Sequence, residues 1–161
     1  MRITSTAVVV LLFAALPGRA SQLQLLDINA ADGSVTPYPG VLQAAPQISA
    51  DGRYAVYSSQ STTLVPGQID LTATQDVFLF DRSTGTTTLV SHNAVSPVTA
   101  GNRKSSSPVI SRDGRWIVFL SDAGDLIPGQ RAAPPSAAFL YDRVAGTTTL
   151  LSPDHVSGGI P

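Results

Sequence analysis

The feature that most constrains this chain is a segment of about 60 residues that occurs twice. Residues 46–59 (PQISADGRYAVYSS) return as residues 108–121 (PVISRDGRWIVFLS), 62 positions later. The later part of the segment, residues 74–91, returns 61 positions later as residues 135–152. The aligned stretches share 22 identities in 43 positions. A duplication of this kind predicts two structural units of one fold that stack on each other.

Each copy is expected to form four short strands. In the first copy one strand ends at Ile48, and the others span Tyr54–Ser58, Val77–Phe80 and Thr86–Ser91. The matching strands of the second copy end at Ile110 and span Trp116–Leu120, Ala138–Tyr141 and Thr147–Ser152. Between the first two strands, Asp51-Gly52 and Asp113-Gly114 predict two-residue hairpin turns of type I′, in which both central residues have positive φ.

The apolar runs in these strands favour burial on both faces. Ile117-Val118-Phe119-Leu120 and Val77-Phe78-Leu79-Phe80 do not alternate with polar residues. A strand that is apolar on both sides is covered on both faces, and an antiparallel four-stranded sheet covered by copies of itself is a propeller blade. We therefore expect an all-β fold with two four-stranded antiparallel propeller blades, a partial β-propeller. A β-sandwich is the alternative. We also expect Tyr57, Trp116 and Phe119 in the core between blades.

Composition excludes several other classes. All 11 acidic residues are Asp and nine of the ten basic residues are Arg, so the residues that build long helical faces are scarce. The formal charge of −1 and the lack of a basic run argue against a nucleic-acid partner. The absence of Cys rules out disulfides and thiolate zinc sites.

The N-terminus has the pattern of an export signal. Arg2 precedes ten apolar residues, Ala7–Leu16, and Gly18-Arg19-Ala20 places small residues where a signal peptidase cuts. Ten apolar residues are too few to span a bilayer. We expect cleavage after Ala20, a periplasmic or extracellular mature protein and no membrane span in that mature chain. A buried N-terminal strand or helix is the alternative.

These features divide the chain into six parts. They are a signal peptide (1–20), an outer strand of a preceding blade with a linker (21–43), the first blade (44–93), a linker (94–105), the second blade (106–154) and a tail (155–161). The expected outer strand is Leu23–Asp27.

The repeated motifs resemble those of the TolB-like, WD-repeat-like β-propeller proteins exported by bacteria. The resemblance rests on Pro-x-Ile-Ser-x-Asp-Gly-Arg with a following aromatic residue, on Leu-Val-Pro-Gly, on Asp-Val-Phe-Leu-Phe-Asp-Arg and on Gly-Thr-Thr-Thr-Leu-Val-Ser, within residues 44–152. It implies a propeller of six or more blades that serves as a binding platform; relatives form the propeller half of some oligopeptidases. The chain departs from the family pattern after Pro-Gly, where Gln68-Ile69-Asp70 and Gln130-Arg131-Ala132 replace an acidic-Asn loop.

The sequence offers few candidates for chemistry. It contains no Gly-x-Ser-x-Gly nucleophile elbow, and its two histidines, His92 and His155, occupy unmatched positions after the last strand of each copy. We expect both in turns or loops. The chain is therefore not expected to be an enzyme, and no catalytic residue or cofactor is assigned.

Metal binding is also not expected. Asp122 with Asp125, and Asp70 with Asp76, offer oxygen ligands, but a calcium ion takes six to eight and neither pair recurs in the other copy. These carboxylates are expected to form turns.

The recurring charged residues are expected to be structural. Arg53, Arg115, Asp81 and Asp142 flank hairpin turns, where hydrogen bonds or ion pairs within a blade are the simplest role. Arg103-Lys104 is expected in a solvated loop.

The sequence thus predicts an exported, non-catalytic binding or scaffold module for a protein or cell-envelope partner, with no ligand-binding residue identified. The alternative is a fragment of a longer propeller protein, such as the propeller half of an oligopeptidase-like hydrolase. Because two blades cannot close a ring, we expect self-association of roughly three or four copies into six or eight blades, or poor folding.

Overall fold

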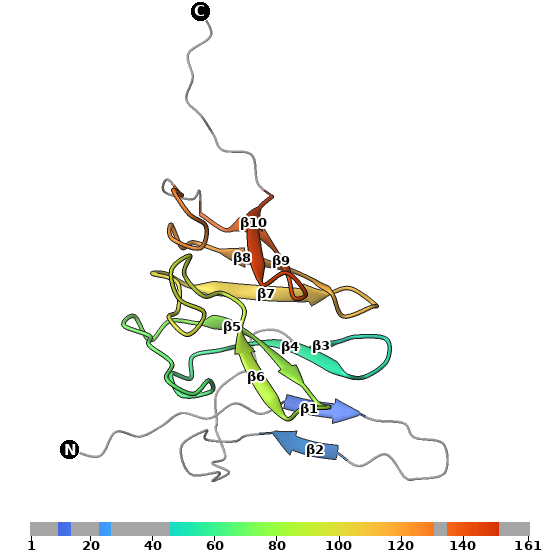
Figure 1. Cartoon of the computed structure of the whole chain (residues 1–161). Helices are drawn as coiled ribbons and strands as arrows, with labels where there is room; N and C mark the ends of the chain where they lie inside the picture. The colour runs from blue at the N-terminus through green and yellow to red at the C-terminus, as the bar shows by residue number, and fades with distance from the viewer. Residues whose placement is uncertain (1–9, 14–22, 27–45, 131–134, 152–161) are drawn as a thin grey trace, which may run out of the picture.

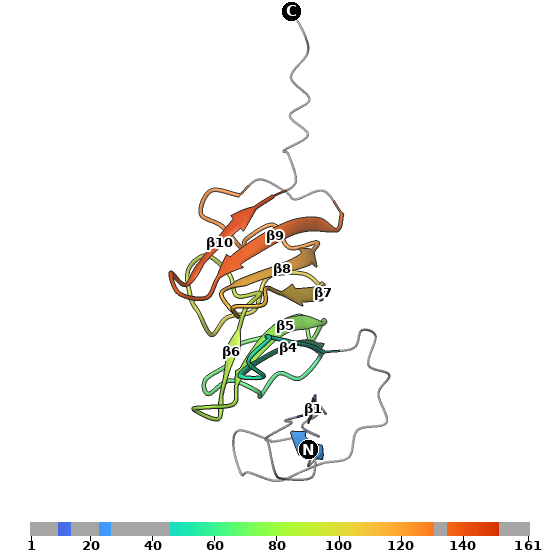
Figure 2. The same cartoon turned by 90° about the vertical axis from the view of Figure 1, so that its right-hand side faces the viewer.

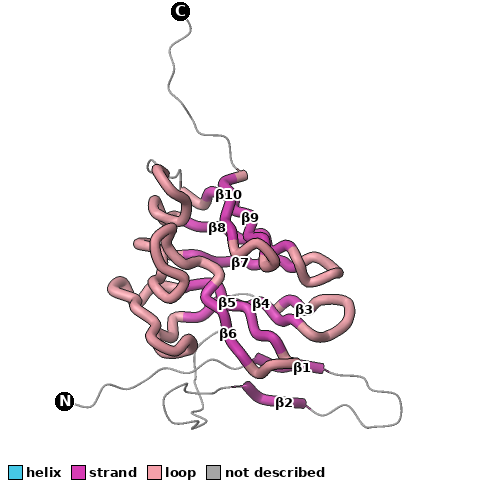
Figure 3. Tube along the Cα trace, viewed as in Figure 1, coloured by secondary structure: helices cyan, strands magenta, loops and turns pink. Residues whose placement is uncertain are grey.

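The structure is a computed structural model, and it describes residues 10–13, 23–26, 46–130 and 135–151. These residues form strands, turns and loops with no helix among them (Figure 3). The predicted all-β class is confirmed. Within the described residues, no helix exists that is long and apolar enough to cross a membrane.

The first blade is an antiparallel sheet in the order β3-β4-β5-β6. Its strands are β3 (Gln47–Ile48), β4 (Tyr54–Ser59), β5 (Asp76–Asp81) and β6 (Thr86–Leu89). The central pair β4–β5 is in register from Tyr54 opposite Asp81 to Ser59 opposite Asp76. The four strands follow one another in space as they do along the chain, which is a meander, with a long loop (residues 60–75) between β4 and β5.

The second blade repeats this order as β7-β8-β9-β10. Its strands are β7 (Ser105–Ile110), β8 (Trp116–Ser121), β9 (Ala137–Asp142) and β10 (Thr147–Leu150). The register of β7 on β8 shifts between Ser106 and Val109, and Ser107 takes a positive φ of 54° there. Such a bulge bends the edge strand. The two four-stranded antiparallel sheets confirm the predicted pair of blades.

The blades stack face on face (Figures 1 and 2). One apolar core fills the space between them, and it includes Val56, Leu79, Ile117, Phe119 and Phe139. The rings of Phe119 and Phe139 stack with their centroids 5.7 Å apart. The expected place of Phe119 between the blades is thus confirmed.

A separate pair of strands precedes the blades. Strand β1 (Val10–Phe13) pairs antiparallel with β2 (Leu23–Leu26). Both views draw this pair on the side of the first blade that faces away from the second blade. A strand was expected at Leu23–Asp27, but its hydrogen-bonded partner is β1 and not a blade. The predicted cut after Ala20, most of the 21–43 linker and the 155–161 tail lie outside the described residues.

The hairpins between the first two strands of each blade are not type I′ turns. Gly52 and Gly114 have φ of 69° and 72°, but neither Asp51 nor Asp113 has a positive φ. The Gly52 amide instead donates to the Ser49 carbonyl at 2.9 Å, which closes a type I turn followed by a left-handed glycine. The Asp51 carboxylate accepts a hydrogen bond from the Arg53 amide at 3.0 Å, so Asp51 stabilises the turn without adopting positive φ.

Coverage on both faces is found for the first blade and not for the second. In β4 and β5 the apolar residues of both faces are buried. In β8, buried residues alternate with exposed ones, and Trp116, Val118 and Leu120 are 36–37% exposed. The expectation that both sheets are covered on both sides is therefore wrong for the second blade, because no described part of the chain packs on its far side.

Candidate functional site

The outer face of the second blade is an apolar surface that the described residues leave uncovered. We define it as the side of β7–β10 that faces away from the first blade, with Val109, Trp116, Val118, Leu120 and Leu140 upon it. Val109 lies opposite Val118 on β7 and β8, and Val118 lies opposite Leu140 on β9. Because directly opposite side chains on a sheet are in contact, these residues form one continuous row.

Trp116 is held in place at one end of this face. The Arg115 guanidinium lies over its ring, 4.5 Å from the centroid. Arg115 also forms an ion pair with Asp142 at 2.7 Å. The hydrogen bond from Arg115 lowers the pKa of Asp142 to about 2, so the carboxylate stays ionised at neutral pH. The indole thus packs against a charged pair.

The opposite end of the face is polar. A shallow hollow there is lined by Lys104, Ser106, Leu120, Ser121, Asp122 and Ser136. The Asp122 carboxylate accepts a hydrogen bond from the Ser136 amide at 2.6 Å. An apolar row with a polar margin is the composition of a protein-binding surface.

The equivalent face of the first blade is covered, and it shows how these side chains pack against a neighbouring sheet. The residues that the repeat aligns with Trp116, Val118 and Leu140 are Tyr54, Val56 and Leu79. All three are buried against the second blade, with exposures of 4%, 0% and 3%. The outer face therefore carries the same side-chain pattern as an established interface between sheets.

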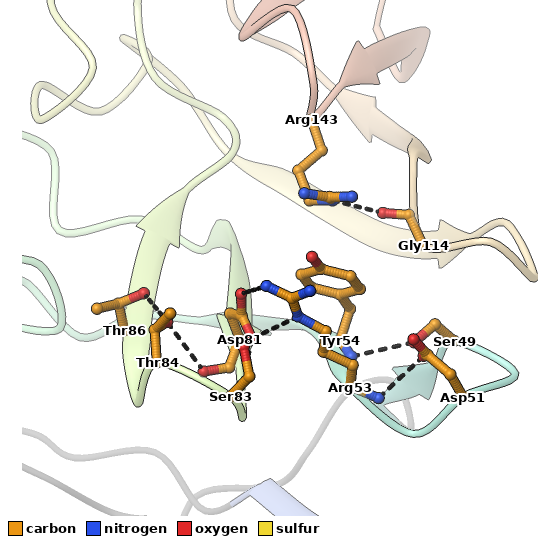
Figure 4. Close-up of polar contacts among 10 residues, drawn as sticks. All are labelled: Ser49, Asp51, Arg53, Tyr54, Asp81, Ser83, Thr84, Thr86, Gly114 and Arg143. Atoms are coloured by element: carbon orange, nitrogen blue, oxygen red, sulfur yellow. Dashed lines mark hydrogen bonds and ion pairs between the residues drawn. The ribbon is translucent and has the colours of Figure 1, made fainter.

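Tyr54 lies at one end of that covered interface, among charged residues of both blades (Figure 4). Arg53 of its own blade lies 4.7 Å from the ring centroid, and Arg143 of the second blade lies 4.0 Å from it. The Arg143 side chain donates from Nε to the Gly114 carbonyl at 2.8 Å. Gly114 is buried beneath the tyrosine ring, and a Cβ at this position would collide with it. Glycine and arginine of one blade thus form the seat for an aromatic ring of the other.

The recurring charged residues form the expected ion pairs within each blade. Arg53 donates to both carboxylate oxygens of Asp81 at 3.0 and 2.8 Å, and Arg115 does the same to Asp142. The bond from Arg53 holds the pKa of Asp81 well below its usual range. Each pair ties the first hairpin of a blade to the end of its third strand.

Two of the three aromatic predictions need correction. Trp116 is exposed on the outer face because no blade follows it among the described residues. Tyr57 is buried, but on the face of the first blade that faces away from the second, where its ring stacks on Phe78 at 5.9 Å. The alignment of the repeats shows that these positions lie on the faces of a blade, but it does not tell which neighbour covers each face.

His92 lies in a loop, as expected. Its ring is half-buried, meets the ring of Tyr141 edge-on at a centroid distance of 6.0 Å and hydrogen-bonds through Nδ1 to the Asn93 carbonyl at 2.7 Å. His155 is outside the described residues.

The aspartates considered for metal binding take part in turns and loops. Asp70 accepts hydrogen bonds from the amides of Thr72 and Ala73, and Asp125 from the amide of Asn102. Asp76 is the exception, because it begins β5 and is fully buried. Among the described residues, no group of three His, Cys, Asp or Glu side chains is arranged to hold a metal ion.

Burial raises the pKa of Asp76 to about 7. Ser91 opposes this effect by donating to Oδ1 at 2.8 Å, while the charges of Asp70 and Asp125 add to it. Oδ2 of Asp76 has no hydrogen-bond partner among the described residues. This carboxyl is a pH-sensitive part of the core.

A glutamine in the long loop between the second and third strands of each blade, after Ser59 and after Ser121, was not identified from the sequence as a structural residue. Gln68 Oε1 accepts from the amides of Leu64 and Val65, and its Nε2 donates to the Ser61 carbonyl at 3.0 Å. Gln130 repeats all three bonds in the second blade. Its recurrence after Pro-Gly was the available signal.

Comparisons with known proteins place few restrictions on the chain. No protein-family model matches it, and no curated protein matches it. Among solved structures, it is similar to the crystal structure of TolB from Acinetobacter baumannii, with 19% sequence identity and a TM-score of 0.44. That similarity covers 81% of this chain and 26% of the TolB chain, so this chain spans about a quarter of the length of that protein.

Proposed function

We propose that this chain is an exported, non-catalytic binding module of the propeller type, and that the outer face of the second blade is its protein-binding surface. One observation carries the proposal: this face is open, while the same positions in the first blade are buried against a neighbouring sheet. A contiguous exposed apolar patch on a folded domain marks an interaction site. The occupant is a protein or cell-envelope component that can cover a sheet.

The arrangement of charged groups supports a binding role. The ionised carboxylates Asp81 and Asp142 are engaged by arginines at the ends of the blades. Tryptophan is among the residues that contribute most to the binding energy of protein interfaces. The outer face presents one and carries few charges. Export rests on the N-terminal pattern, and the mass of the processed protein tests it, since cleavage after Ala20 leaves Ser21 as the first residue.

Photo-crosslinking in the cell that makes the protein tests the binding surface. A photoreactive amino acid is placed at position 118, in the middle of the outer face, and at position 95 as a control. Val95 is 92% exposed and lies in a loop outside this face. We expect a discrete protein adduct, identified by mass spectrometry, from position 118 and none from position 95. No adduct from position 118, or the same adducts from both positions, contradicts the proposal.

A further inference from the structure

We propose that the outer face of the second blade binds a second copy of this chain, head to tail, on the far side of that copy's first blade. This rests on the proposed function and names its partner. In this contact Trp116 of one copy packs on Gly52 and Arg82 of the next. The interface inside the molecule provides the template.

That internal interface consists of a ring and its seat. The ring is Tyr54 of the first blade, and the seat is Gly114 and Arg143 of the second. Gly114 offers the bare backbone that the ring approaches, and Arg143 lies 4.0 Å from the ring centroid while donating to the Gly114 carbonyl. A backbone hydrogen bond from Ala50 to the Arg112 carbonyl, 2.9 Å long, joins the two hairpins beside it.

The repeat supplies a second ring and a second seat. Trp116 aligns with Tyr54, Gly52 with Gly114, and Arg82 with Arg143. In the structure this second set is unused. Trp116 is 37% exposed, while no atom lies within 4 Å of a Cβ built on Gly52. Arg82 is exposed, and its guanidinium has no partner among the described residues.

The backbone groups of the second hairpin contact are also unused. By the same alignment, the Arg112 amide of one copy would donate to the Ala50 carbonyl of the next. Within the described part of the chain, that amide and that carbonyl have no hydrogen-bond partner, and both residues are exposed. The ring, its seat and the adjoining hydrogen-bond groups are therefore all present on one copy, and the contact that they would form is not made within it.

The apolar residues of the far side of the first blade, among them Tyr57 and Phe78, are buried in the full chain, and we expect them to become accessible only after processing of the N-terminus. Strands β1 and β2 lie on the seat side of the first blade (Figures 1 and 2). Strand β1 falls within the apolar segment expected to be cleaved, so removing that segment removes the partner of β2. Copy-to-copy docking is thus proposed for the processed chain. Because ring and seat are different surfaces, the contact is heterologous, and it either closes into a ring or continues as a filament.

The single tryptophan of the chain reports on this contact directly. The full chain is produced with its own N-terminus in an exporting bacterial host and purified as the host leaves it. With rising protein concentration we expect the mass in sedimentation velocity to exceed that of one chain. In the same range tryptophan emission shifts to shorter wavelength and acrylamide quenching falls, because Trp116 leaves water. A monomer whose tryptophan stays accessible at every concentration overturns the inference.

Two complementary variants test the direction of docking. Trp116→Asp removes the ring, and Arg82→Glu reverses the charge of the seat. Each variant alone is expected to be a monomer, and an equal mixture is expected to form a dimer that stops at two chains, since only one intact ring and one intact seat remain. Val95→Asp and Arg103→Glu, which make the same changes at other exposed positions, are expected to assemble like the unmodified chain.

The outcomes separate this inference from the proposed function. If Arg82→Glu still assembles alone, or the mixture remains monomeric, head-to-tail docking is wrong. If the unmodified chain is monomeric and position 118 crosslinks to another protein, the binding surface stands and the second copy is not its partner. If position 118 crosslinks to nothing, both are wrong. The fluorescence of the unmodified chain tests the inference even where a variant fails to fold.

Discussion

The guanidinium carbon of Arg143 lies 4.0 Å from the centroid of the Tyr54 ring, across the junction between the two blades. The same side chain donates to the Gly114 carbonyl at 2.8 Å (Figure 4). One arginine thus fixes both the aromatic ring of the first blade and the hairpin of the second. The blades are held together at this end by a charged group and not by apolar contact alone.

Removing this arginine is expected to loosen the junction. Arg143→Ala loses a cation–π contact and a hydrogen bond, and we expect the free energy of unfolding to fall by about 2 kcal/mol. Arg82→Ala, its counterpart in the first blade, is the matched control and is expected to change that free energy by less than about 0.5 kcal/mol. Urea denaturation in dilute solution measures both. Equal losses for the two variants would show that Arg143 contributes nothing specific to the junction.

The two hairpin glycines are expected to differ in their tolerance of a methyl group. Gly52 and Gly114 both have a positive φ, so alanine costs about 1 kcal/mol at either position. At Gly114 the added Cβ also collides with the buried Tyr54 ring, whereas at Gly52 it meets open space. We therefore expect Gly114→Ala to be less stable than Gly52→Ala by a further ~1–3 kcal/mol. Thermal unfolding of the pair decides it, and similar melting temperatures would contradict the close approach.

Stability is expected to decline as pH rises through the range in which Asp76 ionises. Its pKa is about 7 in the folded protein and 3.8 as a free side chain, so the folded state binds more protons between these values. The free energy of unfolding then falls from about pH 4 to about pH 7, by an amount on the order of 4 kcal/mol, and is level above that. Asp76→Asn keeps an oxygen that accepts from Ser91 but has no charge to bury.

Asp76→Asn is therefore expected to remove this decline and to be more stable than the unmodified chain at pH 8. Urea denaturation at a series of pH values from 4 to 8 measures the slope. Asp122→Asn, in a loop, is the control and is expected to keep the slope of the unmodified chain. A decline that persists in Asp76→Asn would mean that another group causes it.

The loop glutamines are expected to be sensitive to a change from amide to carboxylate. Gln68 donates through Nε2 to the Ser61 carbonyl, and a glutamate would place a second acceptor against it. We expect Gln68→Glu to lower the free energy of unfolding by about 1–3 kcal/mol, and Gln130→Glu to do the same in the second blade. Gln60→Glu, at an exposed position, serves as the control. Unchanged urea midpoints in the two loop variants would refute the bridging role.

Much of the fold could be predicted because its signals are local. Strand positions follow from apolar runs bounded by turn residues, and the structure extends the predicted second and third strands by one residue at one or both ends. The Arg53–Asp81 and Arg115–Asp142 pairs were predictable because each recurs beside a turn. The turn type was not, because an Asp-Gly pair can be the centre of a type I′ turn or, as here, the last two residues of a type I turn that ends in a left-handed glycine.

The sequence by itself determined that each repeat is a four-stranded sheet with two apolar faces. Successive side chains of a strand point to opposite faces, so an apolar run gives two apolar faces, and both this geometry and the turn residues act within a few positions. It also determined that Tyr54 and Trp116 occupy equivalent places. Only the tertiary structure decided that Tyr54 is buried and Trp116 is exposed. Burial depends on what packs against a face. The second blade covers the face of the first that carries Tyr54, and no described residues cover the face of the second that carries Trp116.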